Sequence, residues 1–139
     1  MEWTLERITE LTAEARREGA FYRGFLAAAE KAVAERDIDA WLAIARGTWA
    51  WLNDNLGVTL ADLGDGPSRS YWETGELLGE CTYRDGKMHG PAPLYYRNGQ
   101  LAKDGTYQDG TLHGTVRTYD ANGQLIEEVT YRDGKVVES

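Results

Sequence analysis

Two histidines are the side chains of this sequence best suited to metal binding. His89 and His113 lie 24 residues apart in matching sequence contexts, each followed by a glycine. If the segment between them supplies two strands of one sheet, the imidazoles lie roughly 9–10 Å apart, at about 4.8 Å per strand. A zinc ion needs its nitrogen ligands at about 2.0–2.1 Å, so these two could not easily share one ion. We therefore expect the histidines to belong to turns, and predict no metal and no cofactor.

The remaining reactive groups do not form a catalytic set. Cys81 has no adjacent histidine and falls on the apolar side of a predicted strand, which is typical of a buried, inert thiol. No glycine-rich loop leads from a strand into a helix, as phosphate binding would require. The Asp-Gly pairs lack the alternating oxygen ligands and closing glutamate of a calcium loop. We predict that the protein is not an enzyme.

Composition narrows the classes of partner. The 139 residues include 15 Lys and Arg against 23 Asp and Glu, a net charge of −8. Such a surface repels phosphate backbones and anionic lipid, which argues against a nucleic-acid partner. The longest apolar run, Ala40 to Ala45, is far shorter than the roughly 18 residues of a membrane span, so no stable membrane insertion is expected. A single cysteine and the lack of a visible leader favour a cytoplasmic location.

The first part of the chain reads as helical. An apolar stripe with helical spacing predicts one long helix over residues 4–34, bent or broken at Gly19; its members are Ile8, Leu11, Ala15, Tyr22, Phe25, Ala29 and Ala32. Asp37 is a suitable N-cap for a second helix, which Gly57 would end. The stripe of this second helix is Ile38, Trp41, Ala45, Trp49, Leu52 and Leu56. We expect an antiparallel helical hairpin over residues 1–56, then a connector over 57–69 with a short helical turn at residues 60–63.

The rest of the chain repeats every 24 residues. Five columns share this period: Tyr71, Tyr95 and Tyr119; Gly75, Gly99 and Gly123; Leu77, Leu101 and Leu125; Tyr83, Tyr107 and Tyr131; Gly86, Gly110 and Gly134. A fixed period of this kind indicates stacked supersecondary units. The predicted fold class is α+β, with the helices followed by a twisted antiparallel β-meander of six or seven strands. Its expected repeats are residues 70–93, 94–117 and 118–139.

The turn residues predict the strand register. Each Asp-Gly pair suits a two-residue type I′ turn, which would pair Tyr83 with Met88 and Gly79 with Ala92. A three-residue loop ending at the other glycine of each repeat would pair Tyr95 with Leu101. The turns are unevenly spaced, so we expect a bulge near Gly90–Pro93 and another near Gly114. This register puts both tyrosine columns on one apolar face and leaves the acidic residues on the other.

The repeat at residues 94–117 resembles a known family. The segments Asn98-Gly99-Gln100-Leu101 and Tyr107-Gln108-Asp109-Gly110-Thr111-Leu112-His113-Gly114 look like the MORN (membrane occupation and recognition nexus) repeat. They are most similar to a bacterial variant often labelled as the antitoxin component of a toxin–antitoxin pair. The resemblance covers about residues 70–139 and implies a β-meander scaffold for protein binding, in some members for lipid binding.

Aromatic residues are the candidate contacts for a partner. The tyrosines Tyr83, Tyr95, Tyr107, Tyr119 and Tyr131 either pack the strands together or form a contact surface of the kind enriched at interface hot spots. Trp51 is expected to point away from the buried stripe of its helix. Trp72 is expected to point away from the apolar face of the sheet. They either anchor a partner or cover the joint between helices and sheet.

These observations favour a non-enzymatic protein-binding module. Its most concrete form is an antitoxin or immunity-type protein that masks a protein partner, for instance a basic toxin, because complementary charge steers association. The alternatives are a membrane-peripheral MORN module and a structural protein that forms homo-oligomers such as a dimer.

Overall fold

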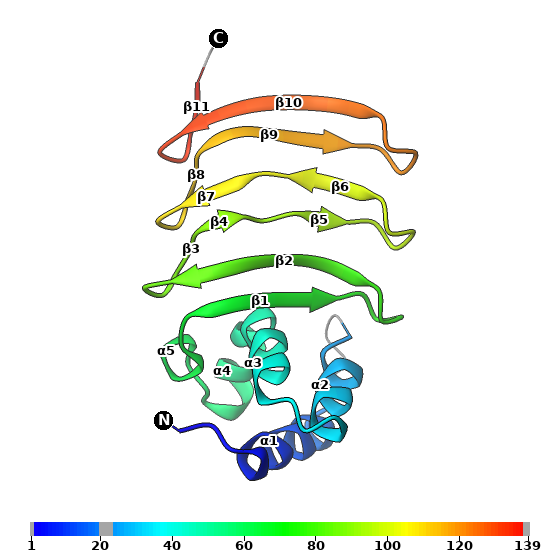
Figure 1. Cartoon of the computed structure of the whole chain (residues 1–139), viewed down its shortest axis with the longest axis vertical. Coiled ribbons are helices and arrows are strands. Elements are labelled where there is room, and N and C mark those ends of the chain that lie inside the picture. The colour runs from blue at the N-terminus through cyan, green and yellow to red at the C-terminus, as the bar shows by residue number, and fades with distance from the viewer. Residues whose placement is uncertain (1, 20–23, 138–139) are drawn as a thin grey trace.

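The helices and the strands form two successive parts of one elongated molecule (Figure 1). The computed structural model describes residues 2–19 and 24–137. Within them, five helices gather at one end and the strands that follow are stacked one above another. This arrangement confirms the predicted α+β class with an antiparallel meander.

The first expected helix is divided. Helix α1 (Leu5–Arg17) begins at Thr4, whose side chain accepts a hydrogen bond from the Arg7 amide at 3.1 Å. Gly19 follows the end of α1 with a φ of 79°, and α2 (Phe25–Ala34) resumes the apolar stripe. The predicted break is thus confirmed; Tyr22 of the predicted stripe lies outside the described residues.

The second expected helix is also divided, at Thr48. Helix α3 (Ile38–Gly47) is capped by Asp37, whose carboxylate accepts the Ala40 amide at 3.0 Å. Helix α4 (Trp49–Leu56) ends at Gly57 with a φ of 70°. Between them Thr48 leaves the helical region, with φ −127° and ψ 20°. The short helix α5 (Leu60–Leu63), within the expected connector, is closed by a capping box between Thr59 and Asp62.

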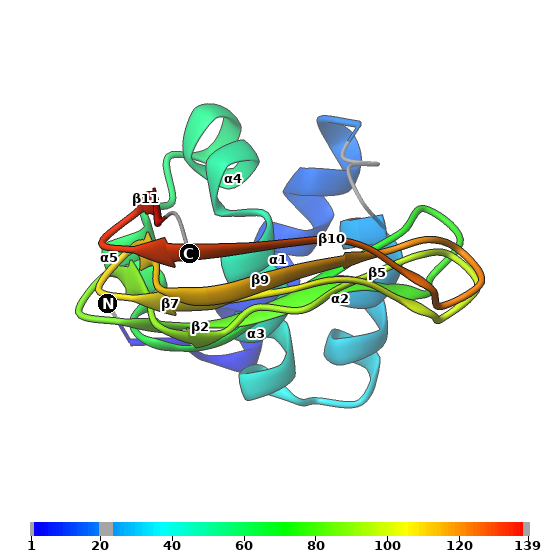
Figure 2. The ribbon, with the colours of Figure 1, turned by 90° about the horizontal axis from the view of Figure 1, so that it is seen from above.

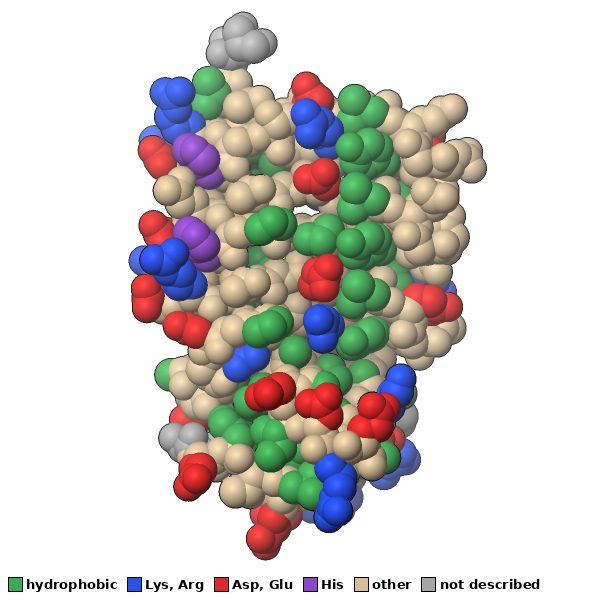
Figure 3. All heavy atoms as spheres, viewed as in Figure 1, with side chains coloured by type: hydrophobic (Ala, Val, Ile, Leu, Met, Phe, Trp, Pro, Cys, Tyr) green, Lys and Arg blue, Asp and Glu red, His purple; other side chains and the backbone are tan. Residues whose placement is uncertain are grey.

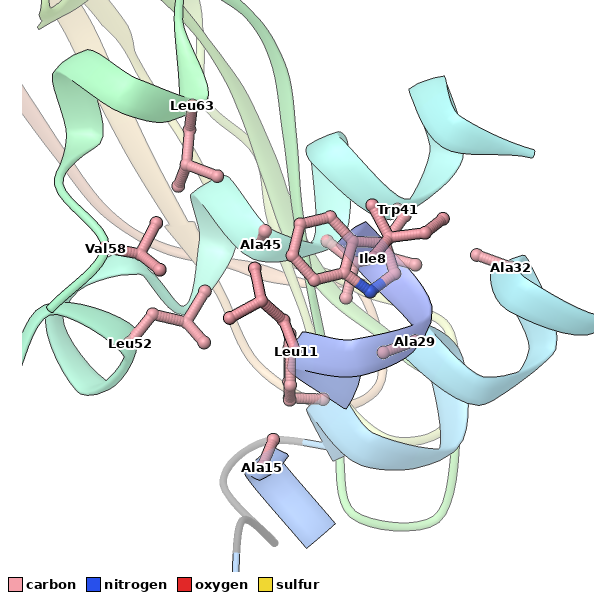
Figure 4. Close-up of a cluster of buried hydrophobic side chains, with 12 residues drawn as sticks. Ile8, Leu11, Ala15, Ala29, Ala32, Trp41, Ala45, Leu52, Val58 and Leu63 are labelled. Atoms are coloured by element: carbon pink, nitrogen blue, oxygen red, sulfur yellow. The ribbon is translucent and has the colours of Figure 1, made fainter. Parts of the chain in front are cut away.

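The hydrophobic core lies in the helical part (Figure 4). Trp41 is fully buried among side chains from α1, α2 and α3, and its indole N–H donates to the Thr12 hydroxyl at 2.8 Å. Among the buried hydrophobic residues of the described ranges, Val116 alone comes from a strand. The strands therefore depend on their neighbours in the sheet and not on a core of their own.

The strand part forms two hydrogen-bonded sheets. The strands are β1 (Gly66–Tyr71), β2 (Leu77–Arg84), β3 (Lys87–Met88), β4 (Gly90–Pro91), β5 (Leu94–Tyr95), β6 (Leu101–Asp104), β7 (Thr106–Gln108), β8 (Thr111–Leu112), β9 (Gly114–Tyr119), β10 (Leu125–Arg132) and β11 (Lys135–Val137). The larger, 8-stranded sheet runs in the order β1-β2-β5-β6-β9-β10-β11, with β3 paired to β2; the smaller runs β4-β7-β8. Strand β1 starts inside the segment expected to be a connector.

The Asp-Gly turns have the predicted geometry. Asp85, Asp109 and Asp133 adopt φ values of 53°, 49° and 51°, and the glycine after each is also positive. Positive φ at both central positions defines a type I′ turn. The predicted pairs Tyr83–Met88 and Tyr95–Leu101 are confirmed.

Two parts of the predicted register are wrong. Gly79 pairs with Leu94 and not with Ala92, because the chain is irregular between the short strands β4 and β5, near the expected bulge. In addition, Ser70 pairs with Gly79 but Tyr71 pairs with Leu77, which leaves Leu78 as an extra residue. A similar shift occurs between Leu125 and Glu127. Each extra residue reverses the alternation of side chains along its strand.

The tyrosine columns consequently lie on opposite faces of the sheet. Tyr71, Tyr95 and Tyr119 share a face with the acidic residues that were expected on the other side, and we call it the ladder face. Tyr83, Tyr107 and Tyr131 lie on the opposite face, which we call the groove face.

The helices meet the sheet mainly at its first strand. Helix α3 packs along β1 so closely that a Cβ atom on Gly47 would come 2.1 Å from the Arg69 carbonyl oxygen. The Ser70 hydroxyl donates to the Gly47 carbonyl at 3.2 Å. Seen from above, α4 projects to one side of the sheet (Figure 2). Trp49 of α4 and Tyr83 of β2 line the groove between this helix and the sheet.

Candidate protein-binding surface

Side chains in the loops that contain Gly75 and Gly99 tie successive repeats together. The Trp72 indole N–H donates to the Tyr95 carbonyl at 3.1 Å, and the Arg97 guanidinium lies 5.0 Å from the centre of the Trp72 ring. One repeat later, the Tyr96 hydroxyl donates to the Tyr119 carbonyl at 2.6 Å. The structure thus places Trp72, half-buried, in a joint between two repeats, which is neither of the two roles considered for it.

The Asp-Gly turns are also joined from one repeat to the next, here by backbone hydrogen bonds. The turn amides of Gly110 and Gly134 donate to the carbonyls of Met88 and Leu112 in the preceding repeats, at 2.9 and 3.0 Å. The first turn has no preceding repeat. There the Asp65 carboxylate accepts the amides of Asp85 and Gly86 at 2.8 and 3.1 Å. These two hydrogen bonds hold the pKa of Asp65 below its usual range.

The ladder face carries paired charges beside apolar side chains. Arg69 Nε lies 3.7 Å from Glu80, and Arg117 Nε donates to Glu128 at 2.9 Å. Figure 3 shows acidic and basic side chains running up the strands next to a hydrophobic column. Tyr95 and Tyr119 belong to this face and are half-buried by their neighbours. Much of its charge is thus matched within the sheet.

The groove face is hollowed where α4 meets β2. The groove measures about 180 Å³ and includes Trp49, Tyr83, Met88 and Leu94 in its lining. Trp49 and Leu94 are two of the large hydrophobic residues that the structure leaves exposed, at 37% and 42%. Tyr107 and Tyr131 continue the column of Tyr83 along the same face, each half-buried.

The structure corrects the burial expected for one tryptophan, Trp49. Trp49 was placed on the buried stripe but is exposed, whereas Trp51 packs against the helical core. The break at Thr48 separates α4 from α3, so the stripe of the first segment does not continue in phase into the second. The adjacent Gly47 and Thr48, both poor helix formers, are the sequence signal that could have indicated this break.

Two of the titratable groups that line the groove, Cys81 and Tyr83, have raised pKa values that favour their neutral forms. Burial raises the pKa of the Cys81 thiol, partly offset by its hydrogen bond with Ser68. Burial likewise raises the pKa of Tyr83, with Cys81 and Tyr107 adding to it and a hydrogen bond with Trp49 opposing it. A thiol with a raised pKa is a poor nucleophile, so the groove is suited to apolar contact more than to covalent chemistry.

The histidines lie along one margin of the ladder-face view (Figure 3). His89 Nδ1 lies 3.5 Å from the Asp109 amide nitrogen and 3.9 Å from an Asp109 carboxylate oxygen. Across residues 2–19 and 24–137, no cluster of three or more His, Cys, Asp or Glu is placed to hold a metal ion.

Comparison with known families identifies the strand part. Residues 64–85, 88–109 and 112–133 match the family model described as MORN repeat variant. The strand part is an array of MORN-variant repeats. The matched segments have the predicted period of 24 but a different phase from the expected 70–93, 94–117 and 118–139. MORN repeats generally serve as protein- or membrane-binding modules.

The remaining comparisons add no relative. No curated protein and no solved structure matches the chain significantly. In the part of the chain that the structure describes, no helix has the length and apolar character needed to cross a bilayer.

Proposed function

We propose that the chain is a non-enzymatic protein-binding module that holds its partner in the groove beside α4. The observation that carries the proposal is the exposed Trp49 side chain, set against Tyr83, Met88 and Leu94 in one hollow. Tryptophan and tyrosine are enriched among the residues that dominate binding energy, and methionine among those at interfaces generally. Tryptophan and tyrosine bury a large apolar area with little loss of conformational entropy, because each has only two side-chain torsions.

The groove is built on a rigid support. Trp49 belongs to a helix that packs against the core, and Tyr83 belongs to a strand hydrogen-bonded to β1 and β3. A site on rigid elements loses less entropy when it binds than a site on a loop. The repeats then extend the same face beyond the groove, with Tyr107 and Tyr131 available for further contacts.

We further propose an antitoxin- or immunity-type role, in which the partner is a basic protein that the chain masks. The net charge of −8 supports this, because opposite charge accelerates association and disfavours acidic competitors. The association rate with such a partner should fall steeply as ionic strength rises.

Co-expression with the product of the neighbouring gene tests the proposal. If that product is the partner, the two proteins co-purify and Trp49→Ala weakens binding by about tenfold or more, as expected for an anchor in a groove. Arg17→Ala, an exposed substitution in α1, is the control and leaves binding unchanged. Circular dichroism checks that both variants fold. Equal affinity of Trp49→Ala and the unmodified protein would contradict the groove, and a neighbour harmless when expressed alone would contradict the antitoxin role.

A further inference from the structure

The last long strand, β10, has an edge that is paired only in part. Strand β11 pairs with Thr130, Tyr131 and Arg132 of β10, and in the described part of the chain the stretch from Leu125 to Val129 has no strand on that side. In Figure 1, β10 is the outermost long strand, and β11 lies along only one end of it. An unpaired edge presents free backbone donors and acceptors to a further strand.

The repeat shows how this edge is filled elsewhere in the array. Glu128 occupies the position of Glu80 two repeats earlier, and the Glu80 amide donates to the Pro93 carbonyl of the next repeat at 3.2 Å. Asp104, one repeat earlier, is paired with Arg117 on the next strand. By this equivalence, the Glu128 amide points toward the open edge, where a further strand would lie.

The apolar residues at this edge are more exposed than their counterparts. Leu125 and Ile126 are 52% and 62% exposed, and Val136 of β11 is 62% exposed. The equivalent side chains in the first two repeats are half-buried: Leu77, Leu78, Leu101 and Ala102. A further repeat follows each of those positions, whereas in the described chain no repeat follows Leu125 and Ile126.

The loop of the third repeat lacks the hydrogen bond by which Trp72 and Tyr96 in the first two repeats reach the following repeat. Trp72 and Tyr96 reach the following repeat, but Asp120 stands at the equivalent position and accepts the amides of Asn122 and Gln124 in its own loop, at 2.9 and 3.0 Å. The opening is therefore bounded by a self-satisfied loop at one end and by β11 at the other.

The charges along the Leu125–Val129 edge of β10 determine which kind of strand can pair with it. Glu127 and Glu128 lie at the centre of this edge. If the same edges of two protein molecules paired antiparallel about this centre, Glu127 of one molecule would lie opposite Glu127 of the other. Like charges directly opposite each other destabilise a sheet. Within the array, the strand opposite the corresponding Asp104 supplies Arg117. The charges thus disfavour a second copy and favour a strand that carries a basic residue opposite Glu128.

We infer that the Leu125–Val129 edge of β10 binds an extended segment of the partner protein. That segment adds an antiparallel strand, places Lys or Arg opposite Glu128, and covers Leu125 and Ile126 with an apolar side chain. Main-chain hydrogen bonds supply affinity in such strand addition, and the alternating side chains supply specificity. This inference deepens the proposed protein-binding function and depends on it.

A peptide that copies residues 112–121 is the direct probe, because it contains the β9 strand that pairs with β6 on the equivalent side. Fluorescence anisotropy with the labelled peptide should show saturable binding, and amide chemical shifts should change at residues 125–129. Replacing the peptide's arginine with glutamate should weaken binding about threefold or more, because a cross-strand charge pair becomes a like-charge contact. Shift changes confined to other residues would overturn the inference.

Two substitutions at Glu128 separate the contribution of its backbone amide to peptide binding from that of its side chain. Glu128→Pro removes the outward amide, and proline is tolerated on an edge strand where that amide faces solvent. It should weaken peptide binding about tenfold or more, whereas Glu128→Gln, which keeps the amide, should weaken it less. Methylating the amide nitrogen of the peptide's arginine tests the same contact without altering the protein. Unchanged affinity with the methylated peptide would overturn the inference, as would self-association that Glu128→Pro abolishes.

The partner found by co-purification separates this inference from the proposed function. Loss of that partner with both Trp49→Ala and Glu128→Pro supports both. Loss with Trp49→Ala alone overturns strand addition but leaves the groove intact. Retention with both variants contradicts both.

Discussion

At the scale of single residues, Arg46 joins the helices to the start of the sheet. Its side chain is buried and donates to the carbonyls of Gly64, Pro67 and Leu63 at 2.9, 2.9 and 3.1 Å. Burial lowers the pKa of this guanidinium, which Asp39 and Asp65 partly oppose. The three carbonyls converge on a planar group whose fork of donors matches them.

Arg46→Lys is expected to destabilise the fold by about 2 kcal/mol, because one ammonium cannot satisfy three carbonyls arranged around a guanidinium. Urea denaturation measures the change. Arg84→Lys, at an exposed position on β2, is the control and should change stability by less than about 0.5 kcal/mol. Equal stability of the two variants would show that the Arg46 hydrogen bonds contribute little.

Asp65 should make stability depend on pH in the acid range. Its pKa is lowered in the folded protein by the amides of Asp85 and Gly86, so its contribution is fully present above the unfolded pKa of about 3.9. The contribution is lost as pH falls from there through the folded pKa. Urea midpoints between pH 7 and pH 3 should therefore fall less steeply below about pH 4 for Asp65→Asn, which is already weakened at pH 7. Parallel curves for the two proteins would contradict this assignment.

At the scale of elements, the contact between α3 and β1 joins the two parts of the molecule through backbone atoms. Gly47 has no space for a side chain: a Cβ atom would meet the carbonyl oxygen and carbon of Arg69 at 2.1 and 2.7 Å. A Cβ atom on Gly24, just before α2, would likewise come 2.3 Å from the Trp72 carbonyl oxygen. The helices can approach the first strand this closely because glycines occupy the contact points.

Gly47→Ala is expected to destabilise the protein by about 3 kcal/mol, because backbone must move to admit the methyl group. Gly57→Ala is the comparison: its φ of 70° disfavours alanine, but it has open space around it, so a cost of about 1 kcal/mol is expected. Thermal or urea unfolding gives both values. A smaller loss for Gly47→Ala than for Gly57→Ala would contradict the close contact.

At the scale of the whole molecule, stability is unevenly distributed. In the part of the chain that the structure describes, the helices hold nearly all of the buried hydrophobic residues, and the strands contribute only Val116. Each repeat is held mainly by its neighbours, through main-chain pairing and the joints made by Trp72 and Tyr96. In such arrays, stability is close to a sum of repeat and interface contributions.

Hydrogen exchange should therefore reveal a gradient along the chain. Amides of α3 and β1 should exchange slowest and those of β10 fastest among the long strands, because local opening is easiest where burial is least. Tyr96→Phe removes one joint and should increase exchange in β9 and β10 by about fivefold, equivalent to about 1 kcal/mol, without affecting α3. Uniform protection across the repeats would contradict this picture.

Sequence patterns predicted the local features of this chain well. The Asp-Gly turns follow from steric limits on φ, and Asp37 caps a helix because its carboxylate reaches a free amide. Trp49 shows the limit of such reasoning. One stripe predicted its burial, but the helix breaks at Thr48, and packing around α4 then decides which tryptophan meets solvent.

The sequence alone determined the 24-residue period, the type I′ turns and the division into helical and strand parts, since each depends on interactions between residues close in the chain. Only the tertiary structure decided which face each tyrosine column occupies, because one extra residue in a bulge reverses every side chain beyond it. It also decided that the helices meet the sheet mainly at its first strand and that, among the described residues, β11 pairs with only one end of β10. The first of these depends on contacts between segments far apart in sequence, which no local pattern records.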